Sequence, residues 1–259
     1  MADPRNEKRV FISDDTASMA DAVAGRFLDR LSRRLHGGRI AHVALTGGTS
    51  GTAVLAAVGS HEARNRVDWS RVHVWWGDER FVPRGSAERN ETGARRGLLD
   101  RVTIPEANIH AMAASDGGLD LDDGATAYAA ELARFGTAGR PWPSFDVCFL
   151  GVGPDGHIAS LFPDRAEIQI VDRAVTVVRN SPKPPPERLS LTRPVINTSK
   201  RVWMVLGGAD KASALGLALA GASYESVPAA GAKGRKQTRF FVDRAAAAEV
   251  PADLIEQDW

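Results

Sequence analysis

The sequence predicts an α/β protein with a Rossmann-like, mostly parallel sheet and helices on both faces. Short apolar runs alternate along the chain with longer amphipathic segments, a pattern typical of parallel strands joined by crossover helices. No internal repeat or long linker divides the 259 residues, and α/β folds often reach this length undivided. We therefore predict one domain over residues 1–259, in which the polar residues 1–8 form a flexible tail.

The first half of the chain alternates in this way from its beginning. Residues 10–13 have the pattern of a strand, and a helix follows from an N-cap among Asp14, Asp15 and Thr16 to about Leu35, because its apolar residues recur at spacings of three and four. Further strands are predicted at 39–46 and 71–77, with a short helix at 52–58. A polar stretch then leads into another helix, and 107–112 has the pattern of a short strand.

The second half continues with a helix at 121–135 and strands at 145–151, 174–178, 201–208 and 238–243, with a helix at 210–221 between the last two. His157 is predicted to open a helix after the strand at 145–151. Residues 181–192, "SPKPPPERLSLT", are predicted to form neither a regular helix nor a central strand, because prolines remove N–H donors and fix φ. Residues 228–237 are predicted to be a mobile surface loop.

Composition excludes several classes of function. Lys and Arg number 33 against 32 for Asp and Glu, so we expect no nucleic acid and no membrane among the partners. The amino terminus lacks a secretory pattern and no apolar run approaches ~20 residues, which favours a cytoplasmic enzyme. The single cysteine, Cys148, is expected to be a buried structural thiol. No histidine has metal-ligand spacing to other ligands, so we predict no metal and no cofactor.

Four predicted strands run directly into polar or glycine-rich turns. These turns read "LTGGTSG", "GDERFVP", "GVGPDGH" and "LGGADK". Ligands of open α/β sheets bind beyond the carboxyl ends of the strands. We therefore expect all four turns to line one crevice at one edge of the sheet.

Two of the turns have features of an anion site. Gly47, Gly48, Thr49 and Ser50 precede a helix, where glycines let backbone approach an anion and N–H groups and hydroxyls supply donors. The alternative is an ordinary capped turn. Lys211 lies in the first turn of a helix, where its charge opposes the helix dipole. This position suggests that Lys211 meets an anion, although a solvated lysine is the simpler alternative.

The other two turns carry ionisable groups. Asp78, Glu79 and Arg80 follow one another after a buried strand and form either a salt-bridge cluster or a site, in which Arg80 donates to a phosphate or carboxylate. His157 is the histidine that follows a strand within a glycine-rich turn. A helix amino end there would favour the neutral imidazole, which is the form that a general base needs.

Taken together, these turns resemble the 6-phosphogluconolactonase family, within the larger group that includes glucosamine-6-phosphate deaminase. The matching segments are "LTGGTSG", "WWGDERFVP", "ERNETGARRGLL", "FDVCFLGVGPDGHIASLFP", "ERLSLTRPVIN", "GGADKASAL" and "RFFVDRAAA". The resemblance implies hydrolysis of 6-phosphoglucono-δ-lactone to 6-phosphogluconate in the pentose phosphate pathway. It implies a sugar-phosphate lactone as the partner, and we expect a monomer or weak homo-oligomer.

Two alternative functions, a deaminase and a sugar-phosphate sensor, fit the sequence less well. Deaminases resemble one another in a D-E-Y-type motif and an acidic residue after the G-H, whereas this chain has Arg80 at the tyrosine position and "IASLFP" after His157. A non-catalytic sugar-phosphate sensor would typically carry a DNA-binding module, for which this chain has no basic segment. One departure from the family concerns "GGTSG" at 47–51, where the family usually has G-G-S-T-P, so which hydroxyl contacts phosphate stays open.

The resemblance also implies roles for the candidate residues. His157 is expected to act as general base on the water that attacks C1, and Asp155 to orient its ring. Backbone N–H groups of 151–156 or Arg80 would stabilise the oxyanion, and Asp78 would bind sugar hydroxyls or Arg80. The phosphate is expected between the 47–50 loop and Lys211. Further phosphate candidates are Arg80 and, as a weaker guess at the end of the 174–178 strand, Arg179.

Overall fold

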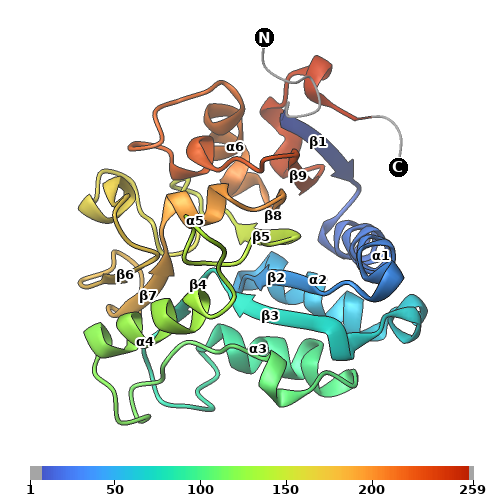
Figure 1. Cartoon of the computed structure of the whole chain (residues 1–259). Coiled ribbons are helices and arrows are strands. Elements are labelled where there is room, and N and C mark those ends of the chain that lie inside the picture. The colour runs from blue at the N-terminus through green and yellow to red at the C-terminus, as the bar shows by residue number, and fades with distance from the viewer. Residues whose placement is uncertain (1–7, 257–259) are drawn as a thin grey trace.

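Six parallel strands form the centre of the computed structural model, which describes residues 8–256. Their order is β1-β9-β8-β5-β2-β3 (Figure 1), and every neighbouring pair is parallel. The strands are β1 (Lys8–Ser13), β2 (Ala41–Leu45), β3 (Val72–Trp76), β5 (Val147–Gly151), β8 (Arg201–Leu206) and β9 (Gln237–Asp243). The predicted parallel sheet is confirmed.

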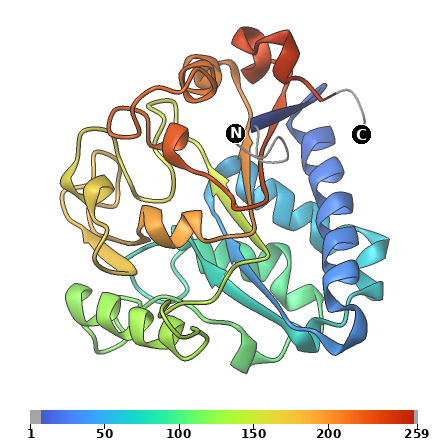
Figure 2. The ribbon, with the colours of Figure 1, turned by 45° about the horizontal axis from the view of Figure 1, so that its top comes forward.

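Helices cover both faces of this sheet, as predicted. They are α1 (Thr16–Leu35), α2 (Gly48–Ser60), α3 (Asn90–Gly97), α4 (Leu121–Ala133), α5 (Arg193–Asn197) and α6 (Ala212–Leu219). Figure 2 shows α1 and α2 on one side and α4 and α5 on the other. Of the three candidate N-caps of α1, Asp15 is the one used, because its side chain accepts from the N–H of Ser18 in a capping box.

A second, antiparallel sheet was not predicted. It consists of β4 (Asp78–Arg80), β7 (Arg188–Leu191) and β6 (Val175–Val178), with β7 in the middle. The prediction that 181–192 holds no central strand is therefore wrong for residues 188–191. The prolines end at Pro186, so every residue of β7 keeps its N–H for pairing. Likewise, residues 78–80 pair as a strand rather than forming a turn.

Four smaller predictions are also wrong. No helix opens at His157, and 107–112 contributes only an isolated bridge between Val74 and Ile109. The segment 228–237 is not a surface loop, because Ala229 and Ala232 are fully buried. Lys8 belongs to β1 rather than to a tail, and the rest of the predicted tail, 1–7, lies outside the described residues.

The predicted buried thiol is confirmed, and a cluster of histidines packs elsewhere in the sheet. Cys148 is fully buried, and burial raises the pKa of its thiol to about 12. His42 and His73 stack with ring centroids 5.0 Å apart near the amino-terminal ends of β2 and β3. His110 joins them, because its Nε2 lies 2.9 Å from Nδ1 of His73. This cluster therefore lies toward the opposite end of the strands from the turns predicted to form the site.

The carboxyl ends of the parallel strands lie at one edge of the sheet. There β2 leads into α2, β3 into β4, β5 into the turn of His157, and β8 into the turn of Lys211. Within residues 8–256, no helix is long and apolar enough to span a bilayer. The prediction of one undivided domain stays a prediction.

Candidate active site

The four predicted turns line one pocket of about 240 Å³ at the carboxyl edge of the six-stranded sheet. It brings together most of the residues selected from the sequence. Those that line the pocket are Gly47, Gly48, Thr49, Ser50, Asp78, Arg80, His157 and Lys211. Asn90, Lys183 and Arg188 also line it and were not predicted. The expectation of one shared crevice is thus confirmed.

The turn after β5 is a tight reversal rather than the start of a helix. Gly153 donates its N–H to the carbonyl of His157 at 3.0 Å, and Val152 pairs with Ile158 as an antiparallel bridge. A Cβ at Gly153 would lie 2.0 Å from Nδ1 of His157, so only glycine leaves room for the ring. Gly156 has φ +82°, a region that favours glycine. These two glycines shape the turn that holds the imidazole.

His157 is paired with the carboxylate of Asp155. Asp155 Oδ1 lies 2.6 Å from His157 Nδ1, and an ionised carboxylate can only accept, so Nδ1 carries the hydrogen of this bond. Nε2 is then the ring nitrogen with a free lone pair. Burial tends to raise the pKa of Asp155, but the hydrogen bond from His157 and the charges of His157 and Lys183 outweigh it and hold this pKa well below its usual range.

Lys183 reaches the same pair from the proline-rich segment. Its Nζ lies 3.3 Å from Asp155 Oδ1 and 3.2 Å from His157 Nδ1. Sequence reasoning missed it, because residues 181–187 have no periodic pattern that would place a side chain. The one signal was a cationic residue held among prolines, which restrict the backbone and so fix where the side chain can reach.

The glycine-rich segment is the beginning of α2 itself. Gly47 is the N-cap and has no side chain to accept from the first-turn N–H groups, which leaves these donors directed toward the pocket edge. A Cβ at Gly47 would lie 1.8 Å from the Asn90 side-chain oxygen, and one at Gly51 would lie 2.8 Å from Thr46 Cγ2. Gly51, where the family usually has proline, is thus required here by close packing.

Lys211 lies at the end of a short 3₁₀ turn, Ala209–Lys211, and is the N-cap residue of α6. Its Nζ is 3.1 Å from both carboxylate oxygens of Asp210. The sequence suggested that Lys211 meets an anion, and in this structure that anion is the Asp210 carboxylate. The turn is fixed by Asp243 at the end of β9, which accepts from the Gly208 N–H at 3.0 Å. Lys211 also lines the pocket.

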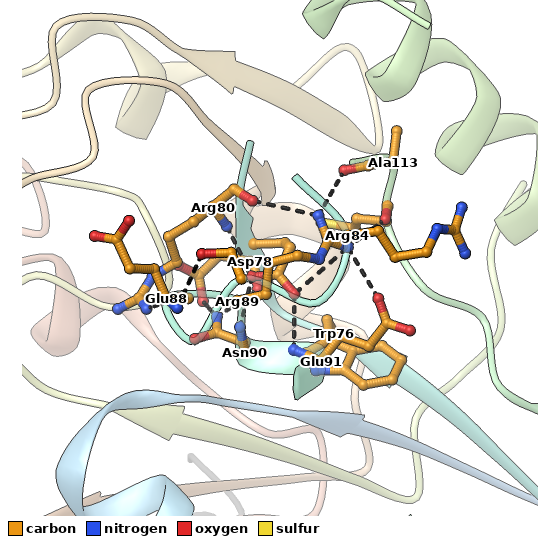
Figure 3. A network of polar contacts seen from close by, with 12 residues as sticks. Trp76, Asp78, Arg80, Arg84, Glu88, Arg89, Asn90, Glu91 and Ala113 are labelled. Atoms are coloured by element: carbon orange, nitrogen blue, oxygen red, sulfur yellow. Dashed lines mark hydrogen bonds and ion pairs between the residues drawn. The ribbon is translucent and has the colours of Figure 1, made fainter. Parts of the chain in front are cut away.

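Asp78 and Arg80 contribute to the pocket from β4 and are held by buried polar contacts. Asp78 accepts from Ser160 Oγ at 2.7 Å and from Asn90 Nδ2 at 3.3 Å. Arg80 Nη1 donates to the Glu88 carbonyl at 2.5 Å. Its Nε is buried and has no hydrogen-bond partner among the described residues. Figure 3 shows Asp78, Arg80 and Glu88 around Asn90.

Glu79, between them, is structural rather than part of the pocket. It is 1% exposed, and its carboxylate accepts from the first-turn N–H groups of α3, those of Asn90 at 2.7 Å and Glu91 at 2.8 Å. Burial raises its pKa to about 7, against the opposing effects of Arg89 and these N–H donors. Arg89, also buried, donates to the carbonyls of Met112 and Ala113 (Figure 3). The two side chains fix the start of α3 beneath the pocket.

Glu79→Gln is expected to lower the free energy of unfolding by about 1–3 kcal/mol, because an amide NH₂ would face backbone N–H groups that need an acceptor. Urea denaturation at neutral pH measures this difference. Glu88→Gln is the matched control, since Glu88 is exposed, and should stay within about 0.5 kcal/mol of the parent. Equal stability of the two variants would contradict the assigned role of Glu79.

Arg179 is not brought into the pocket, so the guess that it binds phosphate has no support from its position. It forms an exposed ion pair with Asp122, and its carbonyl accepts from Arg165. It follows β6, which belongs to the antiparallel sheet. The end of β6 is therefore not one of the carboxyl ends that meet at the pocket. Arg188, from β7, lines the pocket instead.

The fold and the pocket together define an α/β protein with a histidine-containing pocket, lined by several cationic side chains, at the carboxyl edge of its sheet. The model of the family described as glucosamine-6-phosphate isomerases/6-phosphogluconolactonase matches residues 14–241. The chain belongs to this family.

The similar proteins and structures named here are all 6-phosphogluconolactonases. The chain is 46% identical to the 6-phosphogluconolactonase of Streptomyces coelicolor, over 95% of this chain and 96% of that protein. It is 48% identical to that of Mycobacterium tuberculosis, over 81% and 85% of the two chains. The crystal structure of 6-phosphogluconolactonase from Thermotoga maritima superposes with a TM-score of 0.79 at 26% identity, covering 92% of this chain and all of that one.

Proposed function

We propose that this protein hydrolyses 6-phosphogluconolactone to 6-phosphogluconate, with His157 as the general base that activates water. The observation that carries the proposal is the Asp155–His157 pair, 2.6 Å between Oδ1 and Nδ1, in a pocket with several cationic side chains. The relatives named above as 6-phosphogluconolactonases support the substrate. The reaction belongs to the oxidative pentose phosphate pathway.

The chemical step follows from the free lone pair on Nε2. Nε2 removes a proton from water as the water oxygen attacks C1 of the lactone, and the carbonyl oxygen becomes an oxyanion. The C1–O bond of the ring then breaks, and the proton held on Nε2 passes to the departing ring oxygen, which becomes a hydroxyl. Asp155 keeps the ring oriented and stabilises the imidazolium that forms in between.

Arg80 is the better of the two predicted sources of oxyanion stabilisation. Three N–H groups of the 151–156 turn already donate within the protein: Gly151 to Thr46 Oγ1, Gly153 to the His157 carbonyl, and Gly156 to the Gly153 carbonyl. Arg80 lines the pocket, and its guanidinium is positioned by the bond from Nη1 to the Glu88 carbonyl. A pre-oriented donor of this kind is worth about 3–4 kcal/mol in other acyl-transfer sites.

We propose that the phosphate binds between the first turn of α2 and Lys211. The N-terminal N–H groups of a 13-residue helix favour an anion, and Thr49 and Ser50 add hydroxyls at the same edge. Lys211 supplies a full positive charge from the opposite turn. Asp78, held by Ser160 and Asn90, is positioned to bind a sugar hydroxyl.

The deaminase alternative lacks its acid. Residues 158–163, which follow the histidine, contain no carboxylate, and Ile158, Leu161 and Phe162 of this segment are buried. Ring opening of an amino sugar needs an additional acid beside the histidine, whereas lactone hydrolysis needs only the base and its orienting carboxylate. The site therefore favours the lactonase.

A direct assay separates the alternatives. We expect the purified protein to hydrolyse freshly generated 6-phosphogluconolactone well above the spontaneous rate, and to release no ammonia from glucosamine 6-phosphate. Ammonia release would contradict the lactonase proposal in favour of the deaminase. Calorimetric binding of 6-phosphogluconate without turnover of the lactone would contradict it in favour of a sensor. The cytoplasmic location and the monomer or weak homo-oligomer stay predictions.

A further inference from the structure

We propose that Lys183 is a positioning residue of the catalytic base, which holds the Asp155 carboxylate and offsets its charge so that the His157 imidazole stays neutral and ready to accept a proton. This inference rests on the proposed function, because it assigns Lys183 a task in the same general-base step. It adds a third member to the Asp155–His157 pair.

The contacts place Lys183 against both members of the pair. Its Nζ is 3.3 Å from Asp155 Oδ1, the same oxygen that accepts from His157 Nδ1. It is also 3.2 Å from Nδ1 itself. Because Nδ1–H and the ammonium are both donors, the two converge on one carboxylate oxygen rather than bonding to each other. The carboxylate is thus anchored from two sides.

The loop that carries Lys183 is held in place by a buried arginine. Arg188 is 4% exposed, and it donates from Nη2 to the carbonyls of Lys183 at 3.1 Å and Pro184 at 2.7 Å, and from Nε to that of Pro185 at 3.2 Å. Prolines offer no N–H to a strand neighbour, so these carbonyls need a donor from elsewhere. One side chain satisfies all three and fixes where Lys183 leaves the backbone.

The two charges act on the imidazole in opposite directions. The Asp155 carboxylate attracts a positive charge on the ring. The ammonium of Lys183, at 3.2 Å from Nδ1, disfavours the imidazolium. The ring makes direct polar contacts with Asp155 and Lys183, and other groups surround it at the pocket. Phe162 packs on the ring at 4.7 Å between centroids and is uncharged, and the Arg188 guanidinium lies 5.8 Å from the Phe162 centroid. Arg188, Arg80, Asp78 and Lys211 line the same pocket as the ring.

The test is the pH profile of Lys183→Met, which keeps the length of the side chain and removes its charge. We expect the acid limb of kcat/KM to move up by about one pH unit, since one unit corresponds to a tenfold change in the protonation equilibrium. Activity should therefore fall about tenfold on the acid side and recover at alkaline pH. Lys183→Arg keeps the charge and should restore the limb. Lys236→Met, at an exposed lysine outside the pocket, is the matched control and should leave the profile unchanged.

The outcomes distinguish this proposal from the proposed function. An equal loss at every pH, with the limb unmoved, would overturn the role of Lys183 and indicate a contact with substrate instead. An unchanged profile would overturn it as well. NMR titration of the His157 ring reports the same shift without any turnover, so an inactive variant still gives an answer. If a His157 variant loses activity while the acid limb of Lys183→Met stays where it is in the parent, the role of Lys183 is refuted and the proposed function is not.

Discussion

His157→Ala is expected to lower kcat for lactone hydrolysis by about 10²–10⁴-fold, the contribution of a positioned general base. The His157 imidazole is held by Asp155 through Nδ1, which leaves Nε2 free to accept a proton. Alanine has no side-chain group that could take the proton of the attacking water. KM should change little, because proton transfer occurs only in the transition state. The measurement is the initial rate of hydrolysis of fresh lactone, with the spontaneous rate subtracted.

The control for this experiment is His36→Ala, an exposed histidine after α1 and outside the pocket. It should hydrolyse the lactone at the parental rate. Activity of His157→Ala within about threefold of the parent would remove the residue from the mechanism. A comparable loss in both variants would instead point to an effect on folding, which circular dichroism of each protein would detect.

Asp155 is not the group whose protonation limits activity at low pH. The pKa of the Asp155 carboxyl lies well below the usual aspartate range in the folded protein, so this group is ionised at neutral pH. A group with a depressed folded-state pKa stabilises the fold above its unfolded-state pKa, and this contribution is lost only as pH falls toward the folded value.

The large sheet and the location of the site could be predicted because both depend on local patterns. An apolar run followed by a polar, glycine-rich turn marks the carboxyl end of a strand, and parallel pairing brings such ends to one edge. His157 and Asp155 lie two residues apart in one turn, so their pairing needs no long-range information. The glycines at 153 and 156 were visible in the sequence, although their reason, the space taken by the imidazole and a positive φ, was not.

The antiparallel sheet and the residues it delivers could not be predicted in the same way. Its strands are three or four residues long, too short for an alternating pattern to stand out. Lys183 meets Asp155 across 28 positions of sequence, and the hydrogen bonds from Arg188 to the loop carbonyls help to fix that meeting. Arg179 was selected because it ends a predicted strand, but periodicity does not reveal which of two sheets a strand joins.

Lys211→Met is expected to raise KM for the lactone about 10- to 100-fold, because a hydrogen bond to a charged group is worth about 1.5–3 kcal/mol. The lysine is proposed to bind the phosphate, which is present in substrate and transition state alike. Uniform binding of this kind affects KM, while kcat stays near the parental value. Steady-state rates over a range of lactone concentrations separate the two constants.

Asp210→Asn is a control for which KM is not expected to rise. Its carboxylate holds the Lys211 ammonium at 3.1 Å while being largely exposed itself, so it competes with an incoming phosphate for the same charge. Asp210→Asn should leave KM unchanged or lower it, because the amide releases the ammonium to the substrate. An unchanged KM in Lys211→Met would contradict the phosphate assignment. A rise in KM for Asp210→Asn as large as that for Lys211→Met would mean that the ion pair matters for the shape of the turn rather than for the charge it presents.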